Sequence, residues 1–171
     1  MISAMTLRDR LLGALRLDPR AFEDVEHDRG SMSQALTIVV LGSLAASIGA
    51  GLDSGFAALF RETLKAVVGW VMWAVATYFL GTRAWPEAET QTDLDELMRV
   101  IGFAFTPNLF LILEALPVAG EWLRGVVAVW ILATTVVAVR QALDYRSTVR
   151  AFRVVVVGWA IFQLLPFALA S

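Results

Sequence analysis

Five apolar runs dominate the sequence, and each approaches the length of a membrane crossing. A helix rises about 1.5 Å per residue, so a hydrocarbon core of about 30 Å requires roughly 17–25 apolar residues. The runs are Ala35–Leu52, Leu64–Gly81, Val100–Leu116, Trp122–Val139 and Val154–Ala170. They predict an all-α, polytopic membrane protein, in which a cytoplasmic helical lead-in over residues 1–33 precedes a five-helix transmembrane domain over residues 34–171.

The composition supports this class. Hydrophobic residues make up 58% of the 171-residue chain, whereas a soluble domain is usually about 45–50% apolar. An aqueous domain this short could not bury the excess, but a membrane can. Thirteen of the fourteen basic residues are Arg, a bias that fits a GC-rich coding sequence and a bacterial host. The first 33 residues contain no apolar core of a signal peptide, and we expect the protein in the bacterial cytoplasmic (inner) membrane.

The sequence contains no arrangement of residues for catalysis, and we expect a non-enzymatic protein without a cofactor or metal. The chain has no Cys and a single His, His27, which argues against a thiolate nucleophile and against a zinc site. No Gly-rich phosphate loop follows a strand pattern. A net charge of −2 provides no basic field for nucleic acid.

The distribution of basic residues predicts the orientation. With the N-terminus in the cytoplasm, eleven basic residues lie in inside segments and three lie outside, which is a strong positive-inside signal. The inside residues are Arg8, Arg10, Arg16, Arg20, Arg29, Arg83, Arg99, Arg140, Arg146, Arg150 and Arg153; the outside ones are Arg61, Lys65 and Arg124. Five spans then place the C-terminus outside.

The lead-in carries two short helical patterns. In the first, Leu7, Leu11 and Leu15 recur on one face, with Arg residues spread over the other side. Such a segment can lie flat on the cytoplasmic leaflet, or it can dock on the bundle as a soluble lead-in, and both interpretations stay open. Asp18 followed by Pro19 is typical of an N-cap with proline at the first helical position, which predicts a second helix.

The third predicted span is interrupted in its middle. Pro107 lacks an N–H and clashes with the carbonyl of Phe103, so it predicts a kink. In lipid the freed carbonyl needs a donor, for which Thr106 and Asn108 are nearby. Asn108 lies nine residues past Arg99 and Gln163 ten past Arg153 in two spans of the same direction. We expect a hydrogen bond between these two amides.

Glu114 lies in the outer half of the same span, and an acid inside a membrane is a functional hypothesis by default. Its depth allows it to reach Arg124 or the outer headgroups instead. A transporter usually shows a second broken helix in a matching half, and Pro166, near the end of the fifth run, is the other candidate. We favour a structural kink at Pro107 over a transport site.

Two further patterns bear on packing. In the first span, Gly42, Ala46 and Ala50 recur every four residues, and Ala45 with Gly49 and Ser47 with Gly51 repeat this spacing. The pattern favours close approach of another helix or an oligomer contact. Five acidic residues lie between Glu87 and Glu96. We interpret them as a solvated loop rather than as a cation site or a site for a basic partner, with Thr92 capping the helix that follows.

The order of these features resembles a known family. An opening "LRLDPRAFEDVEHD" precedes the small-residue span "ALTIVVLGSLAASIGAG". "VVGWVMWAVATYFLGTR" and an acidic loop follow, and the loop leads into "ELMRVIGFAFTPNLFLIL". The chain closes with "VVAVWILATTVVAVRQAL" and "RAFRVVVVGWAIFQLLPF". This layout, with Pro19, Phe22, Trp70, Pro107 and Trp130, is similar to bacterial members of the YIP family, named for Ypt/Rab-interacting proteins.

The resemblance implies five membrane helices, a cytoplasmic N-terminus and a short far-side tail. Eukaryotic relatives associate with Rab-type GTPases and shape membranes, and they carry an Asp-Leu-Tyr-Gly-Pro motif that this sequence lacks. We expect a non-enzymatic scaffold that binds lipid and another membrane protein, or a second copy of itself. The alternative is a small oligomeric channel or transporter that uses the broken third span. A continuous polar path would favour transport, and a dry core with a cytoplasmic platform would favour the scaffold.

Overall fold

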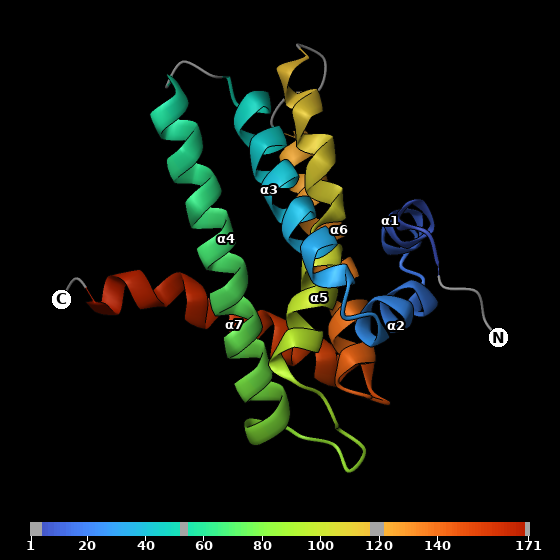
Figure 1. The fold of residues 1–171 in the computed structure, drawn as a ribbon. Helices are drawn as coiled ribbons and strands as arrows, with labels where there is room; N and C mark the ends of the chain where they lie inside the picture. Colours follow the sequence, from blue (N-terminus) through green and yellow to red (C-terminus); the bar gives the residue numbers. More distant parts are fainter. Residues whose placement is uncertain (1–4, 52–54, 117–121, 170–171) are drawn as a thin grey trace.

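The computed structural model describes residues 5–51, 55–116 and 122–169, and for 162–169 it describes the backbone alone. Within these ranges the regular elements are all helical (Figure 1). They are α1 (Leu7–Leu15), α2 (Pro19–His27), α3 (Ser31–Gly49), α4 (Gly55–Phe79), the π-helical η1 (Leu80–Ala84), α5 (Leu94–Ala104), the 3-10 helix η2 (Thr106–Ala115), α6 (Trp122–Ala142) and α7 (Thr148–Leu169). The predicted all-α class is confirmed.

Four helical segments of the described chain are long and apolar enough to cross a membrane: Ser31–Gly49, Gly55–Ala84, Leu94–Ala115 and Trp122–Ala142. They correspond to the first four predicted spans. Most extend beyond the apolar runs because helical hydrogen bonding continues into the polar flanks. The fifth predicted span falls in α7, where the side chains from residue 162 onward lie outside the described residues. The count of five therefore stays a prediction.

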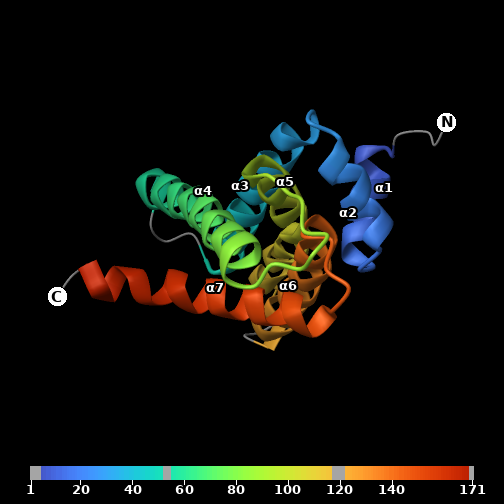
Figure 2. The same ribbon diagram turned by 90° about the horizontal axis from the view of Figure 1, so that it is seen from below.

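The four segments run broadly along one direction, and α7 runs across them in both views (Figures 1 and 2). α7 packs against α4 and α6 near one end of the bundle. α1, α2, the α4–α5 connection and the α6–α7 connection gather at this end, which we call the lead-in end. The end of α3, the start of α4, the end of η2 and the start of α6 lie at the other, the far end (Figure 1).

The lead-in folds into two short helices that dock on the bundle. α1 begins with a capping box, in which Thr6 and Asp9 each accept a hydrogen bond from the other's backbone N–H. Asp18 caps α2 through the N–H of Arg20, with proline at the first helical position, as the sequence predicts. α2 packs against α5 and α6. α1, for which the two interpretations were left open, contacts α5 and η2, so it docks on the bundle. Its contact with the leaflet stays a prediction.

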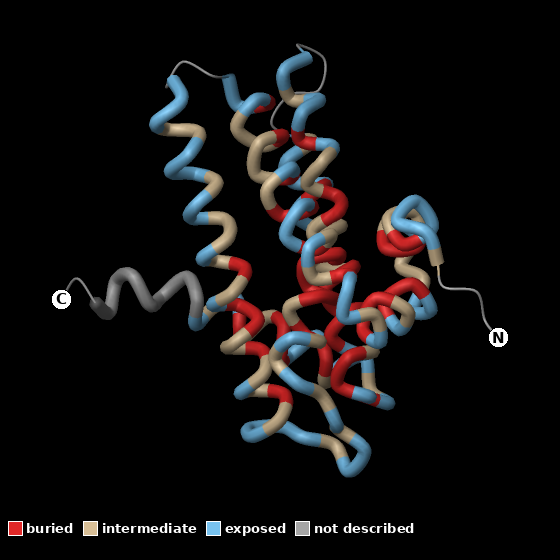
Figure 3. Tube along the Cα trace, viewed as in Figure 1, coloured by how far each residue is buried: buried red, intermediate tan, exposed pale blue. Residues whose placement is uncertain are grey.

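The core is concentrated at the lead-in end (Figure 3). It joins side chains from α2, α5, α6 and α7 with the tryptophans of α4; its largest fully buried members include Phe22, Leu97, Ile101, Phe103 and Leu143. Toward the far end, α4 diverges from α3 and its residues are mostly exposed or half-buried (Figures 1 and 3). There α4 presents Phe56, Phe60, Leu64 and Val68, spaced by four residues, on an exposed face that suits lipid.

Candidate functional site

The third membrane segment changes its helical type at the predicted break. α5 ends at Ala104, and η2 continues from Thr106 as a 3-10 helix with Pro107 at its start. The Thr106 hydroxyl donates to the carbonyl of Phe103 at 2.6 Å, which satisfies the acceptor that Pro107 cannot. The predicted interruption is confirmed, and its form is a change from α to 3-10 geometry rather than a bend within one α-helix.

η2 packs closely against α3, which explains the small residues of the first span. A Cβ placed on Gly42 would lie 2.9 Å from the Cβ of Asn108, and one placed on Gly49 would lie 1.9 Å from the carbonyl oxygen of Leu111. Gly42, Ala45 and Gly49 are buried, whereas Ala50 is exposed. The predicted close approach is present, but the contact face follows a three-and-four spacing rather than the strict spacing of four.

The structure describes one of the two polar side chains that are predicted to pair in the membrane. Asn108 follows the break, is half-buried, and lines a cavity beside α3 and α4. The side chain of Gln163 lies outside the described residues. Their hydrogen bond was inferred from two parallel spans, whereas α7 runs across the bundle (Figure 2). The pairing therefore stays a prediction.

Glu114 lies near the end of η2, and its side chain is 8% exposed. Its carboxylate accepts two hydrogen bonds from Arg124 at the start of α6, from Nε at 3.1 Å and from Nη2 at 2.5 Å. This is the partner that sequence reasoning offered as an alternative to a transport role. A bidentate pair of this kind fixes the far end of η2 against α6.

At the lead-in end, a buried guanidinium ties the lead-in helices to α3. Arg10 is 2% exposed, and it contacts Asp24 at 2.7 Å, Asp28 at 2.8 Å and the Gln34 side-chain oxygen at 3.0 Å. Burial disfavours its charge, but hydrogen bonds to the two carboxylates outweigh this and raise the pKa of Arg10. Sequence reasoning placed Arg10 on the side of the first helix opposite its leucines. Its partners lie 14 to 24 residues away, so helical spacing within α1 could not reveal them.

Two longer-range hydrogen bonds hold the lead-in on the membrane helices. Arg99 of α5 donates from Nη2 to the carbonyl of Glu26 at 2.6 Å. Trp130 of α6 donates from Nε1 to the carbonyl of Leu15 at 3.0 Å. Both acceptors are carbonyls at helix C-termini, which lack intrahelical donors. The ends of α1 and α2 are thus bound to the bundle.

The acidic loop binds the connection between α6 and α7. Glu89 pairs with Arg146, and Glu87 pairs with Arg150 at 3.3 Å. The Tyr145 hydroxyl lies 3.0 Å from the carbonyl of Gly81 and 2.7 Å from that of Trp85. The loop predicted to be merely solvated therefore has basic partners within its own chain. Asp93, rather than the predicted Thr92, caps α5 in a capping box with Glu96.

One carboxyl at this end titrates unusually. Glu26 is 9% exposed, and its burial raises its pKa to about 7, helped by the negative charges of Asp144, Glu96 and Glu23 and opposed by His27. The pKa of His27 is raised in turn, chiefly by its hydrogen bond to the carbonyl of Glu23. A protonated Glu26 is therefore favoured where α2 meets α5 and α6. No cluster of metal-ligating side chains occurs in the described residues.

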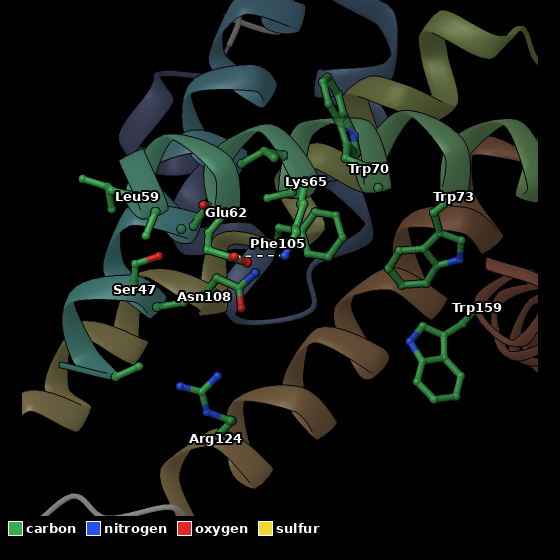
Figure 4. A pocket seen from close by; sticks show the side chains of 18 of the residues that line it. Ser47, Leu59, Glu62, Lys65, Trp70, Trp73, Phe105, Asn108, Arg124 and Trp159 are labelled. Atoms are coloured by element: carbon green, nitrogen blue, oxygen red, sulfur yellow. Dashed lines mark hydrogen bonds and ion pairs between the residues drawn. The ribbon is translucent and has the colours of Figure 1, made fainter. Parts of the chain in front are cut away.

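The far half contains a cavity of about 610 Å³ between α3, α4, the break and α6 (Figure 4). Lys65, Glu62, Arg124 and Asn108 contribute polar groups to its lining, and Trp70, Trp73, Phe105 and Trp159 contribute aromatic rings. The rings of Trp73 and Phe105 lie 5.6 Å apart. Trp70 is held in place by a hydrogen bond of 3.0 Å from its Nε1 to the carbonyl of Met98. Sequence reasoning missed this cavity, because its lining comes from segments that are far apart in the chain.

Four apolar spans, a broken third span and a docked helical lead-in define a multi-pass, α-helical membrane protein. The Yip1 domain family model matches residues 12–170, which is almost the whole chain, and the chain belongs to this family. No curated protein and no solved structure matches it. The resemblance inferred from the layout of the sequence is thereby confirmed.

Proposed function

We propose that this protein is a non-enzymatic membrane scaffold, whose lead-in end presents a rigid platform to a membrane-protein partner. The observation that carries the proposal is the attachment of α1 and α2 to the bundle through Arg10, Arg99 and Trp130. Binding to a preorganised surface costs little ordering entropy. The exposed side of the platform carries Arg20 and Glu23 as polar contact groups. A second copy of the chain is the alternative partner, and nucleic acid is not expected.

The proposed arrangement in the membrane has five spans, a cytoplasmic N-terminus and an outside C-terminus, in the inner membrane of a bacterium. It is supported by the eleven-to-three distribution of basic residues, and the lead-in end gathers the predicted inside segments. Reporter fusions after Glu89, Gly120, Ser147 and Ser171 should alternate in, out, in, out. A cytoplasmic reporter at Ser171 would contradict the fifth span.

A photo-crosslinking experiment tests the scaffold role. A crosslinking residue placed at Arg20 or Glu23 in native membranes should give discrete protein adducts. The same residue at Ala57, which is exposed at the far end, should give lipid adducts alone. Arg20→Glu should remove the adduct formed from Glu23 while the fold remains intact. Equal protein adducts from the platform and from Ala57 would argue against a platform.

Transport is the second candidate, and the cavity beside Asn108 is the observation in its favour. The core of the bundle contains Val100, Phe103 and Val139, which are fully buried, together with a few buried polar side chains such as Thr77. Close packing of the apolar side chains favours the scaffold. Reconstituted protein should therefore conduct neither protons nor cations in proteoliposomes. If the reconstituted protein conducts protons or cations and Glu114→Gln abolishes this flux, the transporter proposal replaces the scaffold proposal.

A further inference from the structure

The far-half cavity has an amphipathic lining whose polarity changes with depth. Lys65 and Glu62 lie at the outer border of the apolar part of α4, and Arg124 lies at the first turn of α6. Trp70 and Trp73 follow Lys65 by five and eight residues, which places them about 8 and 12 Å farther along the helix. The charged side chains Glu62, Lys65 and Arg124 therefore line one part of the cavity, and the rings of Trp73 and Trp159 line another part, farther along α4 (Figure 4).

The charged groups keep free capacity for a ligand. The Lys65 ammonium contacts Glu62 at 2.9 Å, and the side chains are 64% and 45% exposed. Arg124 is 54% exposed and uses two of its nitrogens for Glu114. An ammonium has three donors and a guanidinium has five. Each cation thus keeps donors for an added phosphate while it holds its present carboxylate partner.

The inner part of the cavity suits an acyl chain rather than water or an ion. Its rings belong to Trp70, Trp73 and Phe105, and a volume of about 610 Å³ lies within the range of pockets that hold one small molecule. An ion would need polar groups along its whole path. The rings offer no acceptor to a cation: Phe105 has no polar atom, and an indole N–H only donates, including that of Trp73, which has no partner in the described residues.

We propose that this cavity binds one glycerophospholipid from the leaflet at the far end, with its phosphate at Lys65 and Arg124. A headgroup ammonium would lie at Glu62, so phosphatidylethanolamine matches the charges of the lining best. One acyl chain would enter between α3 and α4 toward Trp73. The proposal goes beyond the scaffold role and does not depend on it.

Lipid retention by the purified full-length protein tests the proposal. After exchange into detergent, phosphatidylethanolamine is titrated and the bound lipid is counted by native mass spectrometry. Wild type should retain one lipid. Lys65→Ala combined with Arg124→Ala should weaken retention at least tenfold. Arg29→Ala combined with Arg83→Ala removes the same charge from exposed residues that do not line the cavity, and it should retain lipid as wild type does.

A second pair of variants tests the acyl-chain part. Ala66 lines the cavity and Val68 lies exposed two residues later on the same helix. Ala66→Phe should fill the cavity and lower retention at least tenfold, whereas Val68→Phe should leave it unchanged. Circular dichroism and gel filtration confirm that each variant is folded. These checks separate loss of the site from loss of the fold.

Three results would overturn the proposal. Retention that is equal in all folded variants would show that lipid binds elsewhere. If excess inorganic phosphate abolishes lipid retention, the cavity is a simple anion site. If the protein is a dimer and Ala66→Phe dissociates it while lipid retention stays unchanged, the cavity binds a second copy of the chain instead of lipid.

Discussion

The two ends of this molecule are built from similarly apolar helices but are packed in different ways. At the lead-in end, four membrane helices and α2 enclose a core that includes Phe22, Ile101 and Phe103, all fully buried. At the far end, α4 diverges and leaves a cavity of about 610 Å³. Lipid tails are as apolar as these side chains, so apolar character alone brings no two helices together in a membrane.

The difference follows from the groups that join the helices at each end. The lead-in end has hydrogen bonds from Arg99, Trp130 and Tyr145 to carbonyls on other elements. At the far end, the close contact is between α3 and η2, where Gly42 and Gly49 allow it. Among the residues that the structure describes, one side-chain hydrogen bond joins α4 to α3 there, between Ser43 and Thr63 at 3.3 Å. Tight packing in this protein therefore depends on polar bonds and small residues.

The largest expected effect is at the lead-in end. Arg10→Ala leaves Asp24 partly buried without its cation, so we expect the free energy of unfolding in detergent to fall by about 3–5 kcal/mol. Thermal unfolding followed by circular dichroism measures this. Arg8→Ala, two residues away and exposed, should change stability by less than about 0.5 kcal/mol. Equal effects of the two substitutions would contradict the role assigned to Arg10.

The next effect tests the contact between α3 and η2. Gly49→Ala places a methyl group 1.9 Å from the carbonyl oxygen of Leu111, and we expect a loss of about 1–3 kcal/mol or more. Gly125→Ala is the matched control, because its methyl group meets no atom within 4 Å. Removal of a helical glycine there should be neutral or stabilising by up to about 1 kcal/mol. If both variants are equally stable, the helices are not in close contact at Gly49.

The third prediction concerns pH. The pKa of Glu26 rises from an ordinary 4.5 to about 7 on folding, so the native state binds the extra proton between these values. Stability should be highest below about pH 4.5 on account of this group and should fall as the pH rises through 7. We expect a loss of roughly 1–2 kcal/mol, because water near the carboxyl screens part of the cost.

Glu26→Gln is the control for this titration. The variant should be less sensitive to pH between 5 and 8, and it should be more stable than wild type at pH 8. A residual slope of the same sign is expected from His27 and Asp144, whose pKa values are also raised. Identical pH profiles of variant and wild type would show that Glu26 is hydrated in the native state.

The smallest effect is expected at the far end. Glu114→Gln removes one charge of the pair with Arg124, whose side chain is half-exposed, so stability should change by about 1 kcal/mol or less. Thermal unfolding in detergent provides the measurement. A loss comparable to that of Arg10→Ala would show that the far end is as tightly held as the lead-in end.

The sequence by itself determined the class of the protein and the position of its break. Four apolar runs became membrane-length helices because their length and hydropathy are properties of continuous segments. Pro107 interrupts the third segment through its missing N–H, which is a local effect. The cap at Asp18 with Pro19 is equally local. The order of these features was sufficient to indicate the family.

The tertiary structure alone decided which residues form the two candidate sites. Arg10 was assigned only to the side of α1 opposite the leucines because helical spacing describes α1 in isolation, whereas its partners come from α2 and α3. The cavity likewise joins Lys65, Asn108 and Arg124 from three segments. Burial of a charge and the shape of a cavity depend on contacts between distant segments. Periodicity within one helix carries no information about such contacts.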